Sequence, residues 1–335
     1  MSSLSGGTDV KDYYEQYGGA VLSTTFDKYC YLVMRFCPPF FEYSGKLIYR
    51  KIEAFNELES IEHPIVREVL KKYAINDIQI IYDADLPARS GIGTSSAFTV
   101  GLLNGIHSLR GEFVDKMTLA KEAIHVERVL CNEAGGWQDQ ITAAFGGFNR
   151  IDFYENSYKV TPIVINQERK DMLDNNLMLF FTGFTRFSAD IQEAAKASFE
   201  EKKSQLDQML ALVDEAQDIL ENKERDLDDF GRLLDKTWRL KRGLAKEVST
   251  GTIDELYAKG IAAGALGGKL LGAGGGGFLL FYVPTKKQRA VKKALGLMEV
   301  PFHFERNGTR VVYFAPETYD LEDRLEDLVE EDSAK

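Results

Sequence analysis

The residues best suited to chemistry form a glycine-containing turn at positions 91–96. Its two glycines permit backbone conformations and close approaches that a Cβ atom would block. The hydroxyl residues that follow open an apolar segment with helical spacing, so free N–H groups and the positive end of a helix dipole face the turn. Such an arrangement suits a phosphate group. The candidate phosphate-binding residues are Gly91, Ile92, Gly93, Thr94, Ser95 and Ser96.

The elements on either side of this turn must hold it in place. Apolar and polar residues alternate from Ile78 to Asp83, which predicts a strand, and Pro87 closes it. An apolar face from Ala97 to Ile106 predicts a helix that ends near Arg110. The turn also has a purely conformational explanation, because glycine and serine are common in tight turns and as N-caps. It lacks the lysine of a Walker A loop and the third glycine of a Rossmann motif.

Two carboxylates follow within the next fifty or so residues. Glu127 lies on a helix expected to begin near Thr118, and Asp139 lies just after the Gly135-Gly136 turn, at the start of a further helix. A solvated helix charge would explain Glu127, and a negative charge in a first helical turn is favourable in its own right for Asp139.

A second glycine-rich segment lies near the end of the chain. Five glycines fall between Gly272 and Gly277, which alone would suggest a flexible linker. The residues before and after them have strand composition, so we expect a tight hairpin loop there. The loop residues of interest are Gly274, Gly275 and Gly276.

These segments, taken in order, resemble the motifs of the GHMP kinases, the family of galactokinase, homoserine kinase and mevalonate kinase. The resemblance implies that the turn at 91–96 wraps the phosphates of ATP and that Ser96 faces Mg²⁺. It implies that Glu127 is a metal ligand and that Asp139, followed by glutamine, is the catalytic base. It places the loop at 274–276 beside the site of phosphate transfer.

The N-terminal glycine turn resembles the sugar-binding turn of the sugar-kinase branch of this family, in which an aspartate binds sugar hydroxyls. The implied substrate-binding residues are Gly6, Gly7, Thr8 and Asp9. A simple loop with an N-cap would also explain them. The strand and the Pro-x-Arg element that precede this turn in the branch are missing here, so either the chain is shortened or it lacks an edge strand.

Basic residues that could bind a substrate phosphate follow in the second half. A Thr-Gly-x-x-Arg loop resembles one that borders the substrate pocket in the sugar-phosphate branch, which makes Arg186 a candidate for a charge-assisted contact. Lys241 and Arg242 are weaker candidates, because basic residues on a helix usually face solvent.

The expected fold is α+β with two lobes. A chain of 335 residues exceeds the usual size of one core, and the resemblance implies a ribosomal-protein-S5-like N-terminal lobe over 1–165 and a ferredoxin-like C-terminal lobe with added helices over 166–335. The strands expected from composition include two between residues 19 and 37, a hairpin at 148–165, a buried strand at 177–181 and a final hairpin pairing 300–304 with 310–314. A long, interrupted helical region is expected from about 188 to 248.

Composition narrows the function classes. The formal net charge of −11 disfavours nucleic-acid binding, which needs basic surface. Three cysteines without paired spacing favour neither zinc nor a disulfide framework. Neither a leader nor a membrane-spanning run is evident, so we expect a cytoplasmic protein that does not bind membranes, as a monomer or homodimer.

Within the family, the chain most resembles the kinases of D-glycero-D-manno-heptose 7-phosphate. The resemblance implies ATP and Mg²⁺ as cofactors and a sugar phosphate as substrate, phosphorylated on its anomeric hydroxyl to a 1,7-bisphosphate that leads to nucleotide-activated heptose. Two alternatives stay open. The acceptor could be fucose, galactose or mevalonate, or the protein could bind sugar and ATP as a sensor without transferring phosphate.

Overall fold

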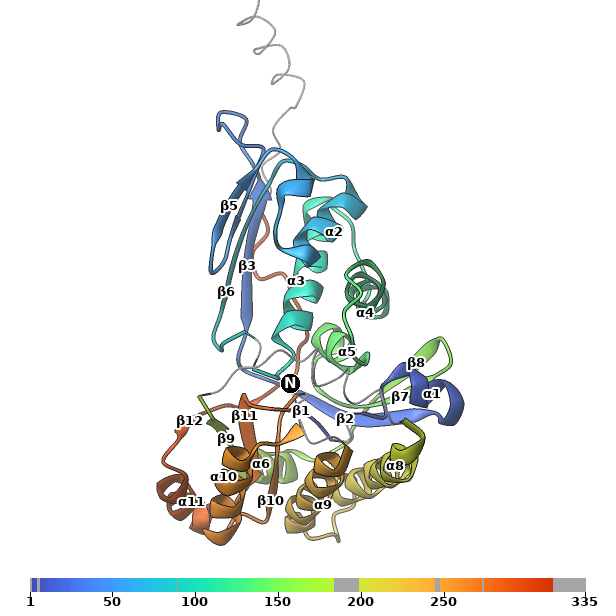
Figure 1. Cartoon of the computed structure of the whole chain (residues 1–335), viewed down its shortest axis with the longest axis vertical. Helices are drawn as coiled ribbons and strands as arrows, with labels where there is room; N and C mark the ends of the chain where they lie inside the picture. The colour runs from blue at the N-terminus through green and yellow to red at the C-terminus, as the bar shows by residue number, and fades with distance from the viewer. Residues whose placement is uncertain are drawn as a thin grey trace, which may run out of the picture.

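The computed structural model describes residues 2–4, 7–88, 90–183, 199–244, 248–272 and 274–315, and these ranges are the ones discussed below. They form two lobes stacked along the long axis of the molecule, with a sheet running across the waist between them (Figure 1). No helix in the described ranges is long and apolar enough to cross a membrane.

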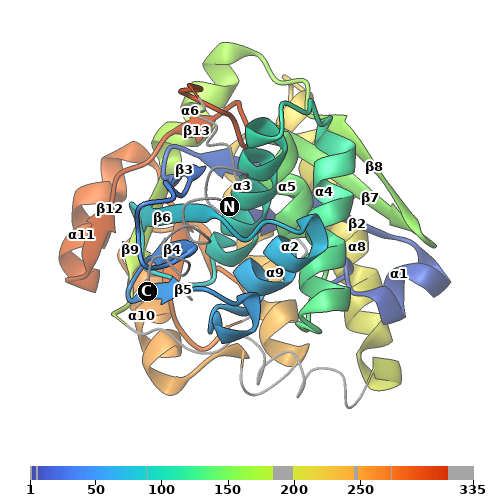
Figure 2. The same ribbon diagram turned by 90° about the horizontal axis from the view of Figure 1, so that it is seen from above.

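The upper lobe is a four-stranded sheet with helices packed on one side (Figure 2). Its strands in spatial order are β3 (Cys30–Phe36), β6 (Ile78–Ala84), β4 (Gly45–Ile48) and β5 (Ile52–Phe55). Its helices are α2 (Pro64–Tyr73), α3 (Thr94–Leu109), α4 (Lys116–His125) and α5 (Gln138–Phe145). A five-residue π-helical turn, Val126–Leu130, follows α4 directly.

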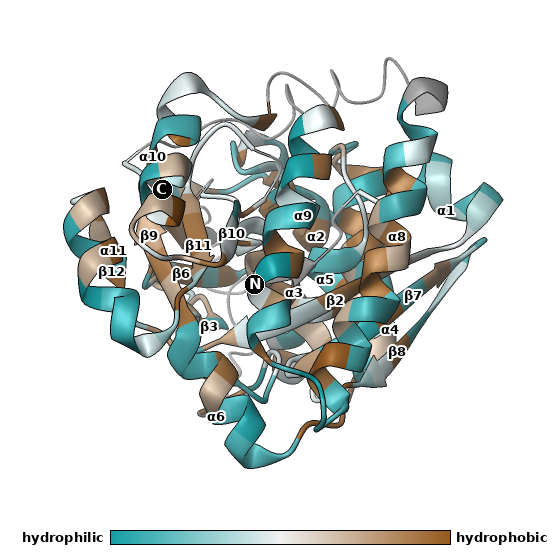
Figure 3. Cartoon of the chain, turned by 90° about the horizontal axis from the view of Figure 1, so that it is seen from below, coloured by the Kyte–Doolittle hydropathy of each residue, from teal (hydrophilic) through white to brown (hydrophobic). Residues whose placement is uncertain are grey.

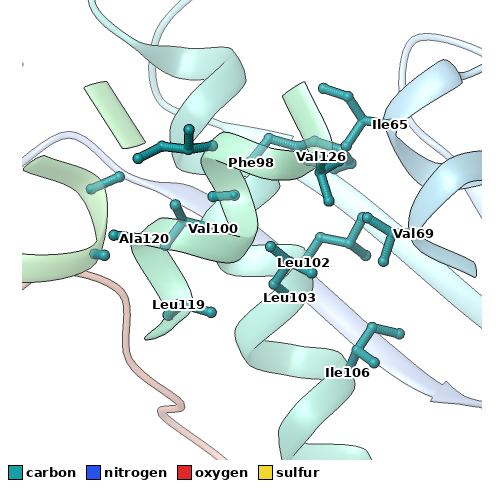
Figure 4. Packing of buried hydrophobic residues seen from close by; sticks show 14 of the residues in the cluster. Ile65, Val69, Phe98, Val100, Leu102, Leu103, Ile106, Leu119, Ala120 and Val126 are labelled. Carbon is teal, nitrogen blue, oxygen red and sulfur yellow. The ribbon is translucent and has the colours of Figure 1, made fainter. Parts of the chain in front are cut away.

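The core of the upper lobe fixes the direction of α3. Val69 of α2, Leu103 and Ile106 of α3, and Leu119 of α4 are fully enclosed or nearly so and pack together (Figure 4). Burying such side chains contributes about 1.5–3 kcal/mol each. Because α3 is held along its length, its N-terminal end stays fixed at the waist of the molecule.

The waist sheet joins distant parts of the chain. Its main path is β1 (Ser2–Leu4), β2 (Gly19–Phe26), β7 (Phe148–Tyr154) and β8 (Ser157–Pro162), and β13 (Phe304–Glu305) also pairs with β2. Helix α1 (Lys11–Tyr17) links the first two strands. The last strand of the chain is therefore bound to one of the first.

The lower lobe is an antiparallel sheet covered by helices. Its strand order is β10 (Gly267–Leu270), β11 (Phe278–Tyr282), β9 (Leu177–Phe181) and β12 (Met298–Val300). The helices are α6 (Gln167–Asn176), α8 (Phe199–Glu221), α9 (Asp228–Leu244), α10 (Gly251–Ala262) and α11 (Gln288–Leu295). Figure 3 shows brown, apolar strands in this lobe and helices with both teal and brown sides, as expected where one helical face packs on a sheet.

Most of the expected elements are present. The strand, turn and helix around residue 91, the pair of strands at 19–37, the hairpin at 148–165 and the strand at 177–181 are all confirmed. The glycine-rich loop is a hairpin loop, because Leu270 of β10 pairs with Leu279 of β11. Helices α8 and α9 confirm the helical region from residue 199 onward, and its expected start near 188 lies outside the described residues.

Two expectations are wrong. The N-terminal turn does have a strand before it, because Ser2–Leu4 pairs with β2, with Leu4 opposite Leu22. The final hairpin does not form, because β12 pairs with β9 and β13 pairs with β2, while residues 310–314 form no strand. The two ends of the first expected strand, Val300 and Phe304, therefore pair with different sheets, so 300–304 does not form one strand that a second could join.

Candidate functional site

The two glycine loops meet backbone to backbone at the waist. A Cβ atom on Gly91 would lie 2.6 Å from the carbonyl oxygen of Leu271, and one on Gly272 would lie 2.3 Å from the Cα of Gly91. Both glycines have positive φ, 77° and 75°. A side chain at either position would force the loops apart, so the glycines at this contact are required by geometry.

Helix α3 begins at this contact. Its N-cap is Gly93 in the left-handed conformation, so no side chain caps the free N–H groups of the first turn. Ile92 is buried among apolar residues of both lobes and anchors the turn, which leaves the backbone to face a ligand. Ser95 is exposed and Ser96 is buried at the start of the helix. The turn at 91–96 therefore presents free N–H groups at a helix N-terminus, the geometry that suits a phosphate, and its role stays a prediction.

Ser96 and Glu127, which are 31 positions apart in sequence, are hydrogen-bonded. The Ser96 hydroxyl donates to Oε2 of Glu127 at 3.1 Å, and the side-chain amide of Gln140 donates to the same oxygen. The other oxygen, Oε1, is buried and has no hydrogen-bond partner among the described residues. An unpaired buried carboxylate oxygen is costly, and a cation beside it would remove that cost.

The donor set fits Mg²⁺ and gives it few protein ligands. Among the described residues, no group of three or more His, Cys, Asp or Glu side chains could hold a metal ion. Mg²⁺ commonly takes one or two protein oxygens and completes its shell with water and substrate phosphates. The Ser96–Glu127 pair beside a phosphate-binding turn matches that pattern.

Asp139 lies in the first turn of α5 and is partly exposed. Its pKa is raised to about 6, chiefly by burial, and repulsion from Asp9 and Glu127 adds to the shift. A base with a pKa near neutrality and some access to a ligand can take a proton efficiently.

Asp9 lies close to Asp139 and is almost fully buried. The backbone N–H of Gly7 donates to its Oδ1 at 2.9 Å, and a Cβ on Gly136 would lie 1.8 Å from its Oδ2. Burial raises the pKa of Asp9, and backbone hydrogen bonds from Gly7 and Gln138 oppose that shift. Thr8 donates its hydroxyl to the carbonyl of Ala20, which fixes the turn to β2.

Sequence reasoning gave no role to Arg128, yet it organises this part of the site. Its guanidinium donates to the carbonyl oxygens of Ala134 at 2.9 Å and Gly136 at 2.8 Å, so it folds the turn that lies against Asp9. The pKa values of Asp9, Glu127 and Asp139 are all raised by burial, and the positive charge of Arg128 opposes that rise. The one sequence signal available was the position of Arg128 directly after Glu127, a candidate site residue.

Two lysines of the lower lobe also belong to the site. Lys241 of α9 and Lys269 of β10 are buried, and both interact electrostatically with Asp9 and Asp139. The sequence gave Lys241 little weight and Lys269 none. The sequence signal that could have indicated Lys269 is its position within GGKLL, an otherwise uncharged segment with strand composition, where a lysine is unusual.

The remaining predicted residues lie at the edge of the described site or outside it. Gly275 donates its N–H to the carbonyl of Val248 at 3.1 Å, and a Cβ on Gly274 would lie 2.6 Å from that same oxygen. Gly276 lies in the same loop, between the strands β10 and β11. Gly6 and Arg186 lie outside the described residues.

Comparison with known proteins identifies the family. The model "GHMP kinases N terminal domain" matches residues 59–147, and "GHMP kinases C terminal" matches residues 209–297. The D-glycero-alpha-D-manno-heptose 7-phosphate kinase of Campylobacter jejuni is 33% identical over 92% of this chain and 96% of its own length. The chain belongs to the GHMP kinases.

Other relatives and solved structures agree with the GHMP kinase fold. A mevalonate kinase of Pyrococcus horikoshii is 28% identical over 70% of this chain and 68% of its own. The structure of a D-glycero-D-manno-heptose 1-phosphate kinase from Bacteroides thetaiotaomicron matches with a TM-score of 0.72 at 23% identity, over 92% of this chain and 95% of that chain. A putative sugar kinase from Campylobacter jejuni matches with a TM-score of 0.65 at 26% identity, over 91% and 94%.

As a GHMP kinase, the chain is an ATP-dependent phosphotransferase that acts on a sugar or another small molecule. The α+β fold with N- and C-terminal domains is confirmed. The division at residue 165 stays a prediction, as do the roles of the individual site residues.

Proposed function

We propose that this GHMP kinase transfers phosphate from ATP to the anomeric hydroxyl of D-glycero-D-manno-heptose 7-phosphate, giving the 1,7-bisphosphate. The proposal is supported by the similarity to a heptose 7-phosphate kinase over nearly the full length of both chains. The observation that carries the chemistry is the electrostatic interaction of Asp139 with Asp9 and Glu127, together with the hydrogen bond from Ser96 in the first turn of α3 to Glu127.

ATP phosphates would bind to the turn at 91–96, with the loop at 274–276 alongside. The free N–H groups of the first turn of α3 and its dipole favour negative charge at that point. Phosphoryl transfer depends mainly on alignment and charge stabilisation, which ordered backbone donors provide without reorganisation.

Ser96 and Glu127 would hold Mg²⁺ through the hydroxyl and the unpaired Oε1. When bound, Mg²⁺ neutralises charge on the ATP phosphates. Gln140 keeps the other oxygen of Glu127 occupied, so the carboxylate is held in one orientation.

Asp139 would accept the proton of the attacking hydroxyl, while Asp9 orients the sugar. The backbone N–H of Gly7 donates to Asp9 and Gly136 lies directly against its other oxygen, so the carboxylate is held in place. Arg186 would contact a phosphate carried by the substrate.

The test is ADP release with Mg²⁺-ATP and D-glycero-D-manno-heptose 7-phosphate, run beside fucose, galactose and mevalonate. Turnover with the heptose phosphate alone is the expected result. Preferred turnover with another acceptor would overturn the substrate assignment while leaving the kinase chemistry in place. Equilibrium binding of sugar and ATP without ADP release would identify a sensor and overturn both.

A further inference from the structure

Two buried lysines of the lower lobe interact with the carboxylates of the candidate site. Among the described residues, Lys241 and Lys269 are the only buried lysine or arginine side chains, at 8% and 3% exposure. Lysine is almost never buried to this degree without a specific reason. Both ammonium groups interact electrostatically with Asp9 and Asp139.

The local structure brings the two lysines to one place. Lys241 donates from Nζ to the carbonyl oxygen of Gly272, the glycine that touches Gly91 of the phosphate-binding turn. Lys269 lies on the same face of β10 as Gly267, since strand residues two apart share a face. Gly267 packs directly on α9, because a Cβ there would lie 2.0 Å from the carbonyl of Gly231. The face of β10 that carries Lys269 is therefore the face toward the helix that carries Lys241.

Burial and mutual repulsion both oppose the protonation of these two lysines. Burial lowers the pKa of Lys241 to about 8, and burial together with repulsion from Lys241 lowers the pKa of Lys269 well below its ordinary value. Two ammonium groups that are out of water and next to each other repel when both are protonated, and the nearby Asp9 and Asp139 favour the protonated forms. An anion between the lysines would relieve the repulsion.

We propose that Lys241 and Lys269 together bind a phosphate group at the reacting end of the site. This inference rests on the proposed function and deepens it, because both the phosphoryl group of ATP and the phosphate of the acceptor present the same oxygens to an ammonium group. Lys241 also connects α9 to Gly272 of the glycine hairpin, so phosphate binding is linked to the contact between Gly272 and Gly91.

The experiment measures equilibrium binding by calorimetry to Lys269→Gln, Lys269→Met, Lys241→Met and the wild-type protein. One arm compares Mg²⁺-ADP with Mg²⁺-ADP plus aluminium fluoride, which mimics the transferred phosphoryl group. The other compares D-glycero-D-manno-heptose 7-phosphate with the unphosphorylated heptose. The control is Lys236→Met, which removes an exposed lysine from the same helix.

We expect each site variant to bind the phosphate-bearing ligand of one arm about tenfold to a hundredfold more weakly, as for loss of a hydrogen bond to a charged group. Binding of Mg²⁺-ADP alone and of unphosphorylated heptose should not change, nor should Lys236→Met differ from wild type. We also expect Lys269→Met to unfold at the same or a higher temperature, because it removes a buried charge. A role in folding alone would lower that temperature and leave binding intact.

The arm that responds identifies the source of the phosphate. Weakened aluminium fluoride binding assigns the pair to the transferred group, and weakened heptose phosphate binding assigns it to the acceptor. Unchanged affinity in both arms would overturn the proposal. This holds even if the pH dependence of kcat/KM assigned to Asp139 shifts in the variants, because the lysines would then act only as counter-ions to the carboxylates. If the wild-type protein does not bind heptose phosphate at all, the substrate assignment fails, whereas the aluminium fluoride arm still tests the lysines.

Discussion

At the scale of single residues, the site depends on charges held away from water. Loss of hydration raises the pKa values of Asp9, Glu127 and Asp139. Asp9 and Glu127 are almost fully buried, whereas Asp139 keeps part of its surface exposed. Asp139 is the most accessible of the three and has the carboxylate best suited to proton transfer. The buried pair instead has fixed partners, the Gly7 N–H for Asp9 and Ser96 for Glu127.

Replacement of Asp139 by Asn should remove most turnover and leave ATP binding nearly intact. A positioned general base typically contributes about 10²- to 10⁴-fold in rate. Because the folded-state pKa of Asp139 is above its ordinary value, ionisation opposes folding as pH rises from 3.8 to about 6. The Asn variant should therefore unfold at the same or a higher temperature at pH 7. A wild-type rate for this variant would disprove the assignment of the base.

The same carboxylate predicts a pH dependence for the wild-type enzyme. A base works only when ionised, so kcat/KM should rise with pH through about 6 and level off above it. The measurement is a pH profile at constant ionic strength with saturating Mg²⁺. A profile that is flat between pH 5 and 7 would count against Asp139 as the essential group.

At the scale of elements, the decisive feature is the contact between two loops that come from different lobes. Gly91 precedes α3 of the upper lobe, and Gly272 follows β10 of the lower lobe. Their backbones touch, so the helix N-terminus and the glycine hairpin move as a unit. We expect the alignment of ATP phosphates to depend on this contact more than on any one side chain.

Replacement of Gly91 by Ala should lower kcat and the unfolding temperature together. The matched control is Gly111→Ala at the other end of α3, where φ is 70° instead of 77° but a Cβ would have nothing within 4 Å. Both variants carry the cost of positive φ, about 1 kcal/mol, and only Gly91→Ala also separates the loops. Equal effects of the two variants on kcat would show that the loop contact has no part in catalysis.

The sequence predicted those elements whose signals are local. The strand before residue 91, the helix after it and the glycine hairpin each follow from periodicity and flanking composition over a few residues. The roles of Arg128 and Lys269 could not be predicted in this way, because they depend on contacts with turns and helices far along the chain. The prediction of a final hairpin was wrong for the same reason. Residues 300–304 have the composition of one strand, but Val300 pairs with β9 of the lower lobe and Phe304 pairs with β2 of the waist sheet.

At the scale of the whole molecule, the end of the described chain is fastened to its beginning. Tyr29 donates its hydroxyl to Glu305 at 2.6 Å, and Thr25 donates to the Glu305 carbonyl at 2.9 Å. The Tyr29 hydrogen bond and backbone N–H groups of Asn307 and Arg306 lower the pKa of Glu305 to about 2. The ionised carboxylate thus helps to hold β13 on β2.

Replacement of Glu305 by Gln should destabilise the protein at neutral pH and have little effect in strong acid. A lowered folded-state pKa contributes stability above the ordinary value of 4.5, and this stability is lost as pH falls through about 2. Thermal unfolding of both proteins from pH 7 down to pH 2 measures the difference. A difference that stays constant over that range would mean that the charge of Glu305 does not contribute.

The pairing of β13 with β2 also has a consequence for how the protein is made. Ribosomal synthesis delivers residues in order, at about 5–20 per second. The strand β2 emerges early, yet the segment that pairs with it at Phe26 and Thr25 is Phe304–Glu305, near the end of the chain. The waist sheet therefore stays incomplete throughout synthesis of the lower lobe. The sheet between the two lobes can be completed only after residues 304 and 305 have left the ribosome.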